Sequence, residues 1–94
     1  MTEAQWQDAV LTLAGLYGWW HYHPYDSRRS VAGWPDLVLC RPPELVMVEL
    51  KTDRGRVRPD QQTWLDRLAA CGVEVTVWRP RDLDAVHEQL KRRC

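Results

Sequence analysis

The fold is decided by GWPDLVLCRPPELVMVELK, residues 33–51, in which two short apolar runs flank a segment with two prolines. The first run is Leu37 to Cys40 and the second is Leu45 to Leu50. Proline lacks the N–H group that a strand ladder needs, and its ring fixes φ. The pattern therefore predicts a β-hairpin with a four-residue loop, residues 41–44.

A loop of this length predicts which residues lie opposite one another in the two strands. Counting outward from the apolar pairs places Asp36 opposite Glu49, where two like charges ~5 Å apart repel. Lys51 follows Glu49 by two residues, so the strand period places it on the same face. The apolar pairs expected before this point are Cys40–Leu45, Leu39–Val46, Val38–Met47 and Leu37–Val48.

Two carboxylates and an ammonium group on one face predict a site for a divalent cation and a phosphate. Hard cations such as Mg²⁺ take oxygen ligands and are held by one or two carboxylates together with phosphate and water. Such an ion would relieve the repulsion between Asp36 and Glu49, and Lys51 could then stabilise charge on a phosphate oxygen. The same residues are equally compatible with a salt-bridge cluster on a half-exposed sheet.

The same residues carry a resemblance to a known family. Pro35-Asp36 followed by Glu49-Leu50-Lys51 is similar to the PD-(D/E)xK nuclease signature. The pattern also includes Gly33 before this signature, the segment Thr52 to Gly55 directly after it, and Gln61 further downstream. In this wider form it resembles the VRR-NUC family, which are virus-type replication and repair nucleases related to archaeal Holliday junction resolvases. The resemblance extends over about Glu3 to Leu90, so we expect one VRR-NUC-like domain over residues 1–94.

This resemblance implies a metal-dependent DNA endonuclease with a restriction-endonuclease-like core and no organic cofactor. It implies Mg²⁺ or Mn²⁺ and a branched substrate such as a four-way junction or a duplex. It implies five catalytic residues, Asp36, Glu49, Lys51, Gln61 and Glu3. It also implies a metal site formed by Asp36, Glu49, Glu3 and the carbonyl of Leu50. An acidic Glu3 is also favourable in the first turn of a helix on electrostatic grounds alone. For Gln61 the alternative is a solvated helix residue.

The total charge does not favour nucleic-acid binding, because thirteen basic residues balance thirteen acidic ones. Tight nonspecific binders are usually clearly basic. The cations are nevertheless clustered and are mostly arginines, whose planar group suits bidentate phosphate contacts. We predict phosphate contacts from Arg28, Arg29, Arg54, Arg56 and Arg58.

The cysteines and the hydropathy pattern indicate the cellular compartment in which the protein acts. Cys40, Cys71 and Cys94 form no CxxC pair, and an odd number argues against a disulfide framework. We expect Cys40 and Cys71 to be small buried residues. No stretch approaches the ~20 apolar residues of a membrane span, and no export signal is present. The expectation is a cytoplasmic protein without membrane contact, acting in the host cell if virus-encoded.

Helical and alternating patterns predict the remaining elements. Thr2 starts a helix that ends before Gly18, an aromatic strand covers residues 19–25, and a second helix starts near Pro59. Residues 73–78 alternate as a strand, and Asp82 caps a last helix. The predicted order is α-β-β-β-α-β-α, a mixed sheet flanked by helices in an α/β domain. The expected buried stripes are Trp6, Ala9, Val10, Leu13, Leu16 and Tyr17; Trp64, Leu65, Leu68 and Ala69; and Leu83, Val86 and Leu90.

The size of the chain predicts a dimer. One site per chain cuts one strand, so two-strand cleavage predicts a two-fold homodimer, with the aromatic strand 19–25 or the last helix at its interface. In that strand His21 and His23 share a face and could bind a transition metal, although a structural role is favoured. The rival hypothesis is a non-catalytic nucleic-acid-binding or interaction module with a vestigial metal site, which the zero net charge fits well.

Overall fold

A computed structural model describes residues 1–24 and 31–92. Its order of helices and strands is the predicted one, with a short 3₁₀ helix added before the last helix. The elements are α1 (Glu3–Leu16), β1 (Trp20–Tyr22), β2 (Leu37–Arg41), β3 (Glu44–Leu50), α2 (Pro59–Ala70), β4 (Glu74–Trp78), η1 (Pro80–Asp82) and α3 (Leu83–Lys91). None of these helices is both long enough and apolar enough to cross a membrane.

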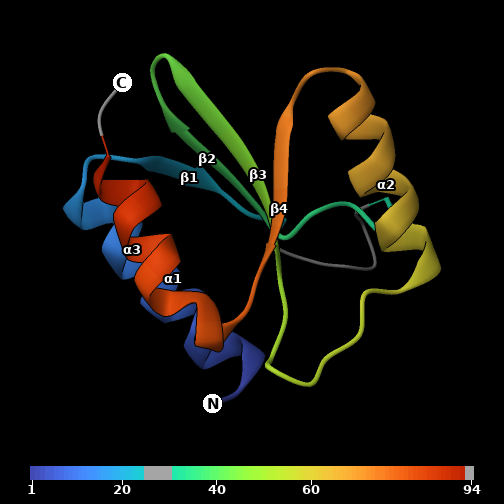
Figure 1. The fold of residues 1–94 in the computed structure, drawn as a ribbon, viewed down its shortest axis with the longest axis horizontal. Helices are drawn as coiled ribbons and strands as arrows, with labels where there is room; N and C mark the ends of the chain where they lie inside the picture. The colour runs from blue at the N-terminus through green and yellow to red at the C-terminus, as the bar shows by residue number, and fades with distance from the viewer. Residues whose placement is uncertain (25–30, 93–94) are drawn as a thin grey trace.

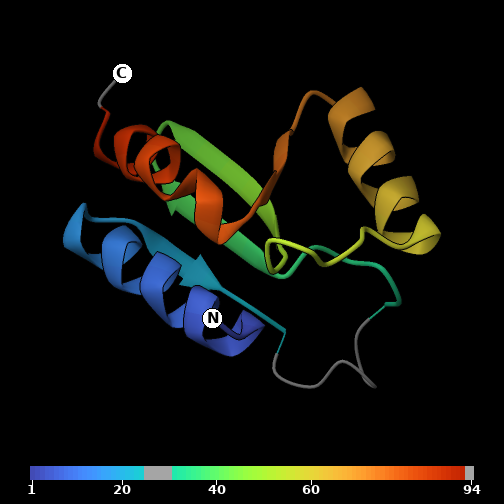
Figure 2. The ribbon, with the colours of Figure 1, turned by 60° about the horizontal axis from the view of Figure 1, so that its bottom comes forward.

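The strands form one mixed sheet in the order β1-β2-β3-β4, with β3 and β4 parallel and the other neighbours antiparallel. Helices α1 and α3 lie together on one side and α2 lies apart beside β4 (Figures 1 and 2). The α1 and α3 side contains the main hydrophobic core, where Trp6 and Val10 of α1 and Leu90 of α3 meet the buried faces of β2 and β3. The predicted mixed sheet flanked by helices is therefore confirmed.

The hairpin register is the predicted one, but its loop is shorter. All four apolar pairs from Cys40–Leu45 to Leu37–Val48 are present, and the ladder continues to a further pair, Arg41 with Glu44. The prediction of a four-residue loop was wrong because only Pro42 and Pro43 lack N–H groups. The flanking Arg41 and Glu44 side chains also form an ion pair at 3.2 Å.

Several residues of the predicted stripes are exposed. Leu16 is 70% and Leu83 44% exposed, and Ala69 is also exposed, so their assignment to buried stripes was wrong. In α1 the buried row is Trp6, Val10 and Ala14, which repeats every four residues and leaves Leu16 on the other side. Cys71, expected to be buried, is exposed at the end of α2.

The aromatic segment and the last cap also differ from the prediction. The strand is only Trp20–Tyr22, because Trp19 turns into the core and its indole Nε1 donates to the Leu90 carbonyl at 2.9 Å. The predicted Tyr25 position lies outside the described residues. Asp82 is the N-cap residue of α3, as predicted, but its side chain makes no capping hydrogen bond to that helix. Its Oδ2 instead accepts from the Arg79 backbone N–H at 2.9 Å, at the start of η1.

Gly33 brings the segment before β2 against the first turn of α2. Its φ is +86°, and a Cβ built there would lie 2.5 Å from the Asp60 carbonyl oxygen. Trp64 of α2 holds the same segment, since its Nε1 donates to the Ala32 carbonyl at 3.1 Å and its ring meets the Trp34 ring edge-on at 5.0 Å. These contacts position Asp36 next to α2.

Replacing Gly33 by alanine should therefore cost far more stability than the same change at Gly18. Both glycines have left-handed φ values, but nothing lies within 4 Å of a Cβ at Gly18. We expect a loss of about 1 kcal/mol for Gly18→Ala and of at least about 3 kcal/mol for Gly33→Ala, where a backbone clash adds to the strain. Urea unfolding measures both, and equal losses would contradict the close approach.

Candidate active site

The Asp36 side chain extends the hairpin beyond its last ladder pair. Its Oδ2 accepts a hydrogen bond from the Leu50 backbone N–H at 2.8 Å. The carboxylate thus fills the place of a strand partner at the end of β3, next to Glu49. The two acidic side chains lie close together, as predicted, because Leu50, whose N–H binds Asp36, directly follows Glu49. After burial, the Asp36 charge is the second cause that raises the pKa of Glu49.

Glu49 is a buried carboxylate with incomplete hydrogen bonding. It is 1% exposed, and its Oε2 lies 2.7 Å from Gln61 Nε2, which donates to it, and 3.3 Å from Lys51 Nζ. Its Oε1 is buried without a hydrogen-bond partner in the described part of the chain. A buried polar atom left unpaired is unfavourable, so this oxygen is available to a ligand.

The surroundings of Glu49 oppose its ionisation. Burial raises the pKa of Glu49 from its ordinary 4.5 to about 7, with the Asp36 charge as the second cause, while the nearby Lys51 acts in the opposite direction. Lys51 is itself buried, at 7% exposure. When both carboxylates are ionised, the single ammonium group of Lys51 leaves one negative charge uncompensated.

Gln61 is the residue of α2 that reaches this pair. It is 6% exposed, its Oε1 accepts from the Arg58 backbone N–H at 2.9 Å, and its Nε2 donates to Glu49. These two bonds together set the orientation of the amide. The adjacent Gln62 is exposed, and its Nε2 donates to Asp66 Oδ1 at 2.8 Å. The N-cap residue of α2, Arg58, makes no side-chain capping bond, and the Gln61 side chain binds the N–H group of this residue.

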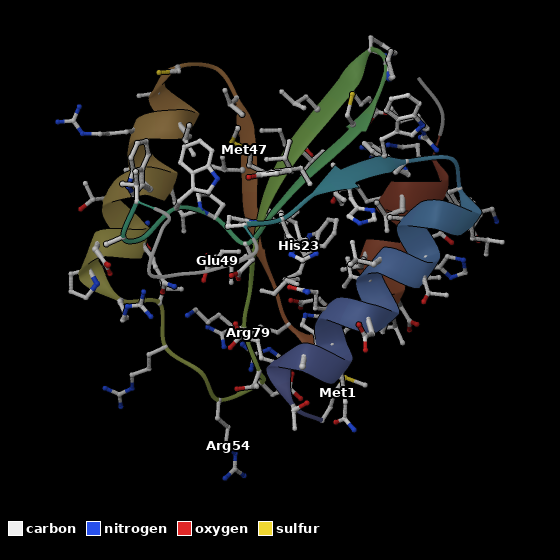
Figure 3. The ribbon with its side chains drawn as sticks, turned by 180° about the vertical axis from the view of Figure 1, so that it is seen from behind. Met1, His23, Met47, Glu49, Arg54 and Arg79 are labelled. Carbon is white, nitrogen blue, oxygen red and sulfur yellow. The ribbon has the colours of Figure 1, made fainter. Side chains whose placement is uncertain are left out.

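A cavity of about 420 Å³ opens over the carboxylate pair, and its lining includes Glu3, Asp36, Lys51, Arg58 and Gln61. Glu49 lies in the middle of this side of the molecule, between α1 and α2 (Figure 3). Four of the five residues predicted to be catalytic therefore line one cavity, and the fifth, Glu49, bonds to two of them, Lys51 and Gln61.

Glu3 lies at the rim and not in the cluster. It is exposed in the first turn of α1. Among residues 1–24 and 31–92, no three His, Cys, Asp or Glu side chains gather closely enough to form a metal site by themselves. His21 and His23 stack with ring centroids 6.1 Å apart, and this pair also lacks a third protein ligand in that range.

The predicted phosphate-binding arginines are only partly described. Arg54, Arg56 and Arg58 are exposed, and Arg58 Nε lies 3.3 Å from Asp60 Oδ1. Arg28 and Arg29 lie outside the described residues. Sequence reasoning missed Arg79, whose side chain lies between Glu49 and Arg54 in Figure 3 and contacts the loop that carries Arg54. No sequence pattern links Arg79 to that loop.

The fold defines the class of protein. It is similar to that of Hjc from Archaeoglobus fulgidus, a Holliday junction resolvase from an archaeal hyperthermophile, with a TM-score of 0.59 and 19% identity over 82% of this chain and 68% of that chain. The chain therefore has an Hjc-like nuclease fold. The VRR-NUC domain model matches residues 4–82, so the chain belongs to the VRR-NUC family, as the sequence motifs predicted. No curated protein matches the sequence.

The raised pKa of Glu49 predicts an unusual dependence of stability on pH. Because the folded state binds this proton more tightly than the unfolded state, ionising Glu49 should destabilise the fold as pH rises from about 4.5 to about 7. In chelator, we expect Glu49→Gln to gain about 2–3 kcal/mol over the unmodified protein between pH 5 and pH 8, since one pKa unit corresponds to about 1.4 kcal/mol.

Urea unfolding at a series of pH values measures this difference. The matched control is Glu88→Gln, which neutralises an exposed carboxylate on α3 and should leave the pH dependence unchanged. A pH profile of Glu49→Gln parallel to that of the unmodified protein would show that Glu49 ionises normally.

Proposed function

We propose that the protein is a Mg²⁺- or Mn²⁺-dependent DNA endonuclease that hydrolyses phosphodiester bonds in branched DNA such as four-way junctions and acts as a homodimer. Membership of the VRR-NUC family and the fold shared with an archaeal Holliday junction resolvase support the reaction class. The observation that carries the proposal is Glu49 Oε1, which is buried beside Asp36 and Lys51 and has no hydrogen-bond partner among residues 1–24 and 31–92.

The donor set fits a hard divalent cation. Asp36 and Glu49 provide carboxylate oxygens, which Mg²⁺ and Mn²⁺ prefer, and a double positive charge would offset the repulsion that raises the pKa of Glu49. Glu3 and the carbonyl of Leu50 would complete the protein ligands. Glu3 is suited to this role because it lines the same cavity. When bound, the ion supplies Lewis-acid stabilisation of the phosphate and lowers the pKa of a water molecule.

The remaining residues of the site position the reacting groups. The Leu50 N–H group orients Asp36, and Gln61 orients Glu49 through its Nε2. Lys51 Nζ, held 3.3 Å from Glu49 Oε2 and lining the cavity, would donate to a phosphate oxygen as negative charge develops there, or hold the attacking water. Because both polar atoms of the Gln61 amide are already bonded, Gln61 acts through Glu49.

Phosphates on either side of the cut would be held by arginines. Arg58 is exposed and lines the cavity, and Arg54 and Arg56 are exposed on the loop that follows Lys51. Arg28 and Arg29 would add to them. Contacts of this kind fix the position of the DNA without reading its bases. The location proposed for this activity is the cytoplasm, as the cysteine pattern predicts.

Cleavage assays on a synthetic four-way junction, a flap and a linear duplex test the activity. We expect cutting with Mg²⁺ or Mn²⁺, none with chelator, and preference for the branched substrates. Asp36→Asn and Lys51→Ala should lower the rate at least about 10³-fold, because each removes charge that the transition state needs. Cutting that survives both substitutions would remove the proposed site.

Adjacent glutamines provide a matched control. Gln61→Ala should lower the cleavage rate by roughly 10-fold or more, since Glu49 loses its positioning hydrogen bond, whereas Gln62→Ala should cut at the normal rate. A rise in unfolding temperature with Mn²⁺ but no cutting of any substrate would instead favour the non-catalytic module with a vestigial metal site.

The homodimer is supported by an open apolar face of the sheet. Trp20 and Tyr22 on β1 are 82% and 65% exposed, and Leu45 on β3 is 45% exposed. The strand register places them on one face with the half-buried Val38, Cys40 and Met47, opposite the face that packs on α1 and α3. A monomer gains nothing from exposing large aromatic side chains.

A second copy of the chain suits this face. The six residues are uncharged, so the face is complementary to an equally uncharged surface, and a two-fold axis brings it against itself. Taking about 150–250 Å² for a whole aromatic side chain, the exposed part is roughly 500 Å² per copy. Two copies would then bury roughly 1,000 Å², which reaches the lower limit of specific interfaces.

Trp20→Glu should therefore convert a dimer into a monomer. We expect the unmodified protein to sediment at about twice the chain mass of 11.1 kDa and Trp20→Glu to weaken association at least about 30-fold, as for a buried interface tryptophan. Leu16→Glu changes a similarly exposed apolar residue on α1 and should stay dimeric. Analytical ultracentrifugation measures the mass, and a dimeric Trp20→Glu protein would exclude this interface.

A further inference from the structure

The loop that follows Lys51 is held at two points by residues beyond β4. This loop, residues 52–57, carries Arg54 and Arg56, both exposed, and contains no helix or strand. Without tethers, a segment of this kind would sample many conformations and would have to be ordered whenever DNA binds. Its contacts with the rest of the chain therefore determine how well its arginines bind phosphates.

Arg79 makes the first attachment. Its Nη1 donates to the Thr52 carbonyl at 2.7 Å and to the Gly55 carbonyl at 2.6 Å, so one guanidinium nitrogen joins both ends of the turn. Hydrogen bonds from a charged donor are about twice as strong as neutral ones. Arg79 is only half-buried, and both of these acceptors belong to the loop.

Asp53 makes the second attachment in the opposite direction. Its Oδ1 accepts from the Arg81 backbone N–H at 2.9 Å, at the start of η1. Within the loop the Gly55 N–H also donates to the Thr52 carbonyl at 3.2 Å. The two attachments use different atoms and different residues on each side, so they restrain the loop independently.

Both attachments connect the loop to the strand next to the active site. β4 pairs with β3 through Leu50 and Trp78, and the Lys51 N–H donates to the Trp78 carbonyl at 3.1 Å. Arg79 follows Trp78 directly. The loop is therefore fixed relative to Lys51 and Glu49 by covalent connection at one end and by β4 at the other.

We propose that Arg79 and Asp53 are positioning residues that hold residues 52–57 as a preformed arm for the sugar–phosphate backbone of DNA, with Arg54 and Arg56 as its contact groups. This inference rests on the proposed function. Arg79 turns its charge inward onto two carbonyls, whereas Arg54 (Figure 3) and Arg56 are exposed to solvent. Ordering the arm before DNA arrives lowers the entropic cost of binding.

Substitutions of Asp53 allow a test in which electrostatics and loop positioning predict opposite changes in DNA affinity. Asp53→Ala and Asp53→Asn each remove one negative charge near the DNA, and charge alone would make both variants bind more tightly. Asn keeps an oxygen that accepts from Arg81, whereas Ala does not. We expect Asp53→Ala to bind a four-way junction about 3–10-fold more weakly and Asp53→Asn to bind at least as tightly as the unmodified protein.

Fluorescence anisotropy in chelator measures these affinities without cleavage, and thermal unfolding confirms that both variants are folded. If the unmodified protein fails to bind DNA, the proposed function itself fails. If it binds and both Asp53 variants bind more tightly by the same factor, the DNA-binding function stands and the positioning role is overturned.

Arg79 is tested by a double-mutant cycle. Arg79→Ala should weaken binding about 5–10-fold and lower the salt dependence of log K by about one unit, because the loop arginines no longer meet their phosphates together. In an Arg54→Ala, Arg56→Ala background the same change should have little further effect. An undiminished loss in that background would show that Arg79 acts other than through these two arginines.

Arg67→Ala is the charge control, because it removes one exposed cation from the last turn of α2. It should change affinity far less than Arg79→Ala does. With Mg²⁺ present, the loss in Arg79→Ala should appear in the DNA concentration needed for half-maximal cleavage, with a rate at saturating DNA within about 3-fold of normal. A large fall in the saturating rate alone would overturn the assignment.

Discussion

The active site is arranged around one buried carboxylate, that of Glu49. A fully buried acidic side chain is unfavourable unless its charge is compensated, and here the compensation is partial. Gln61 donates to one oxygen and Lys51 lies near it, while the other oxygen has no hydrogen-bond partner in the described residues and Asp36 adds repulsion. An incompletely compensated charge of this kind is typical of a functional site, where part of the stability is given up so that a ligand can complete the set.

The surrounding fold holds this carboxylate from three directions. The hairpin brings Asp36 to the end of β3, the left-handed Gly33 lets the preceding segment lie against the first turn of α2, and α2 in turn directs Gln61 inward. Because each of these contacts joins a different pair of elements, the carboxylate pair is fixed only when the hairpin, the Gly33 segment and α2 are all in place.

The distribution of charge and apolar surface matters more for function than their totals. A net charge of zero argues against tight DNA binding when considered alone. In the structure, however, Arg58 is exposed at the cavity, and Arg54 and Arg56 are exposed on the loop after Lys51. By contrast, Arg79 and Arg41 donate to backbone carbonyls, and Arg41 also pairs with Glu44. The apolar residues are also divided between two faces of the sheet. One face is covered by α1 and α3 and forms the core, and the other, which carries Trp20, Tyr22 and Leu45, is open.

The sequence by itself determined the hairpin register and the position of Asp36 beside Glu49. These two features follow from strand alternation and proline placement, which act over a few residues, whereas the inward position of Gln61 was indicated only by the resemblance to the VRR-NUC family. Only the tertiary structure decided that Leu16 is exposed, that Glu3 stays at the rim and that Arg79 clamps the loop after Lys51. These outcomes depend on which distant parts of the chain pack together, and no local pattern of residues specifies that. The contacts of Arg79 with the loop, for example, join residues 24 or more positions apart.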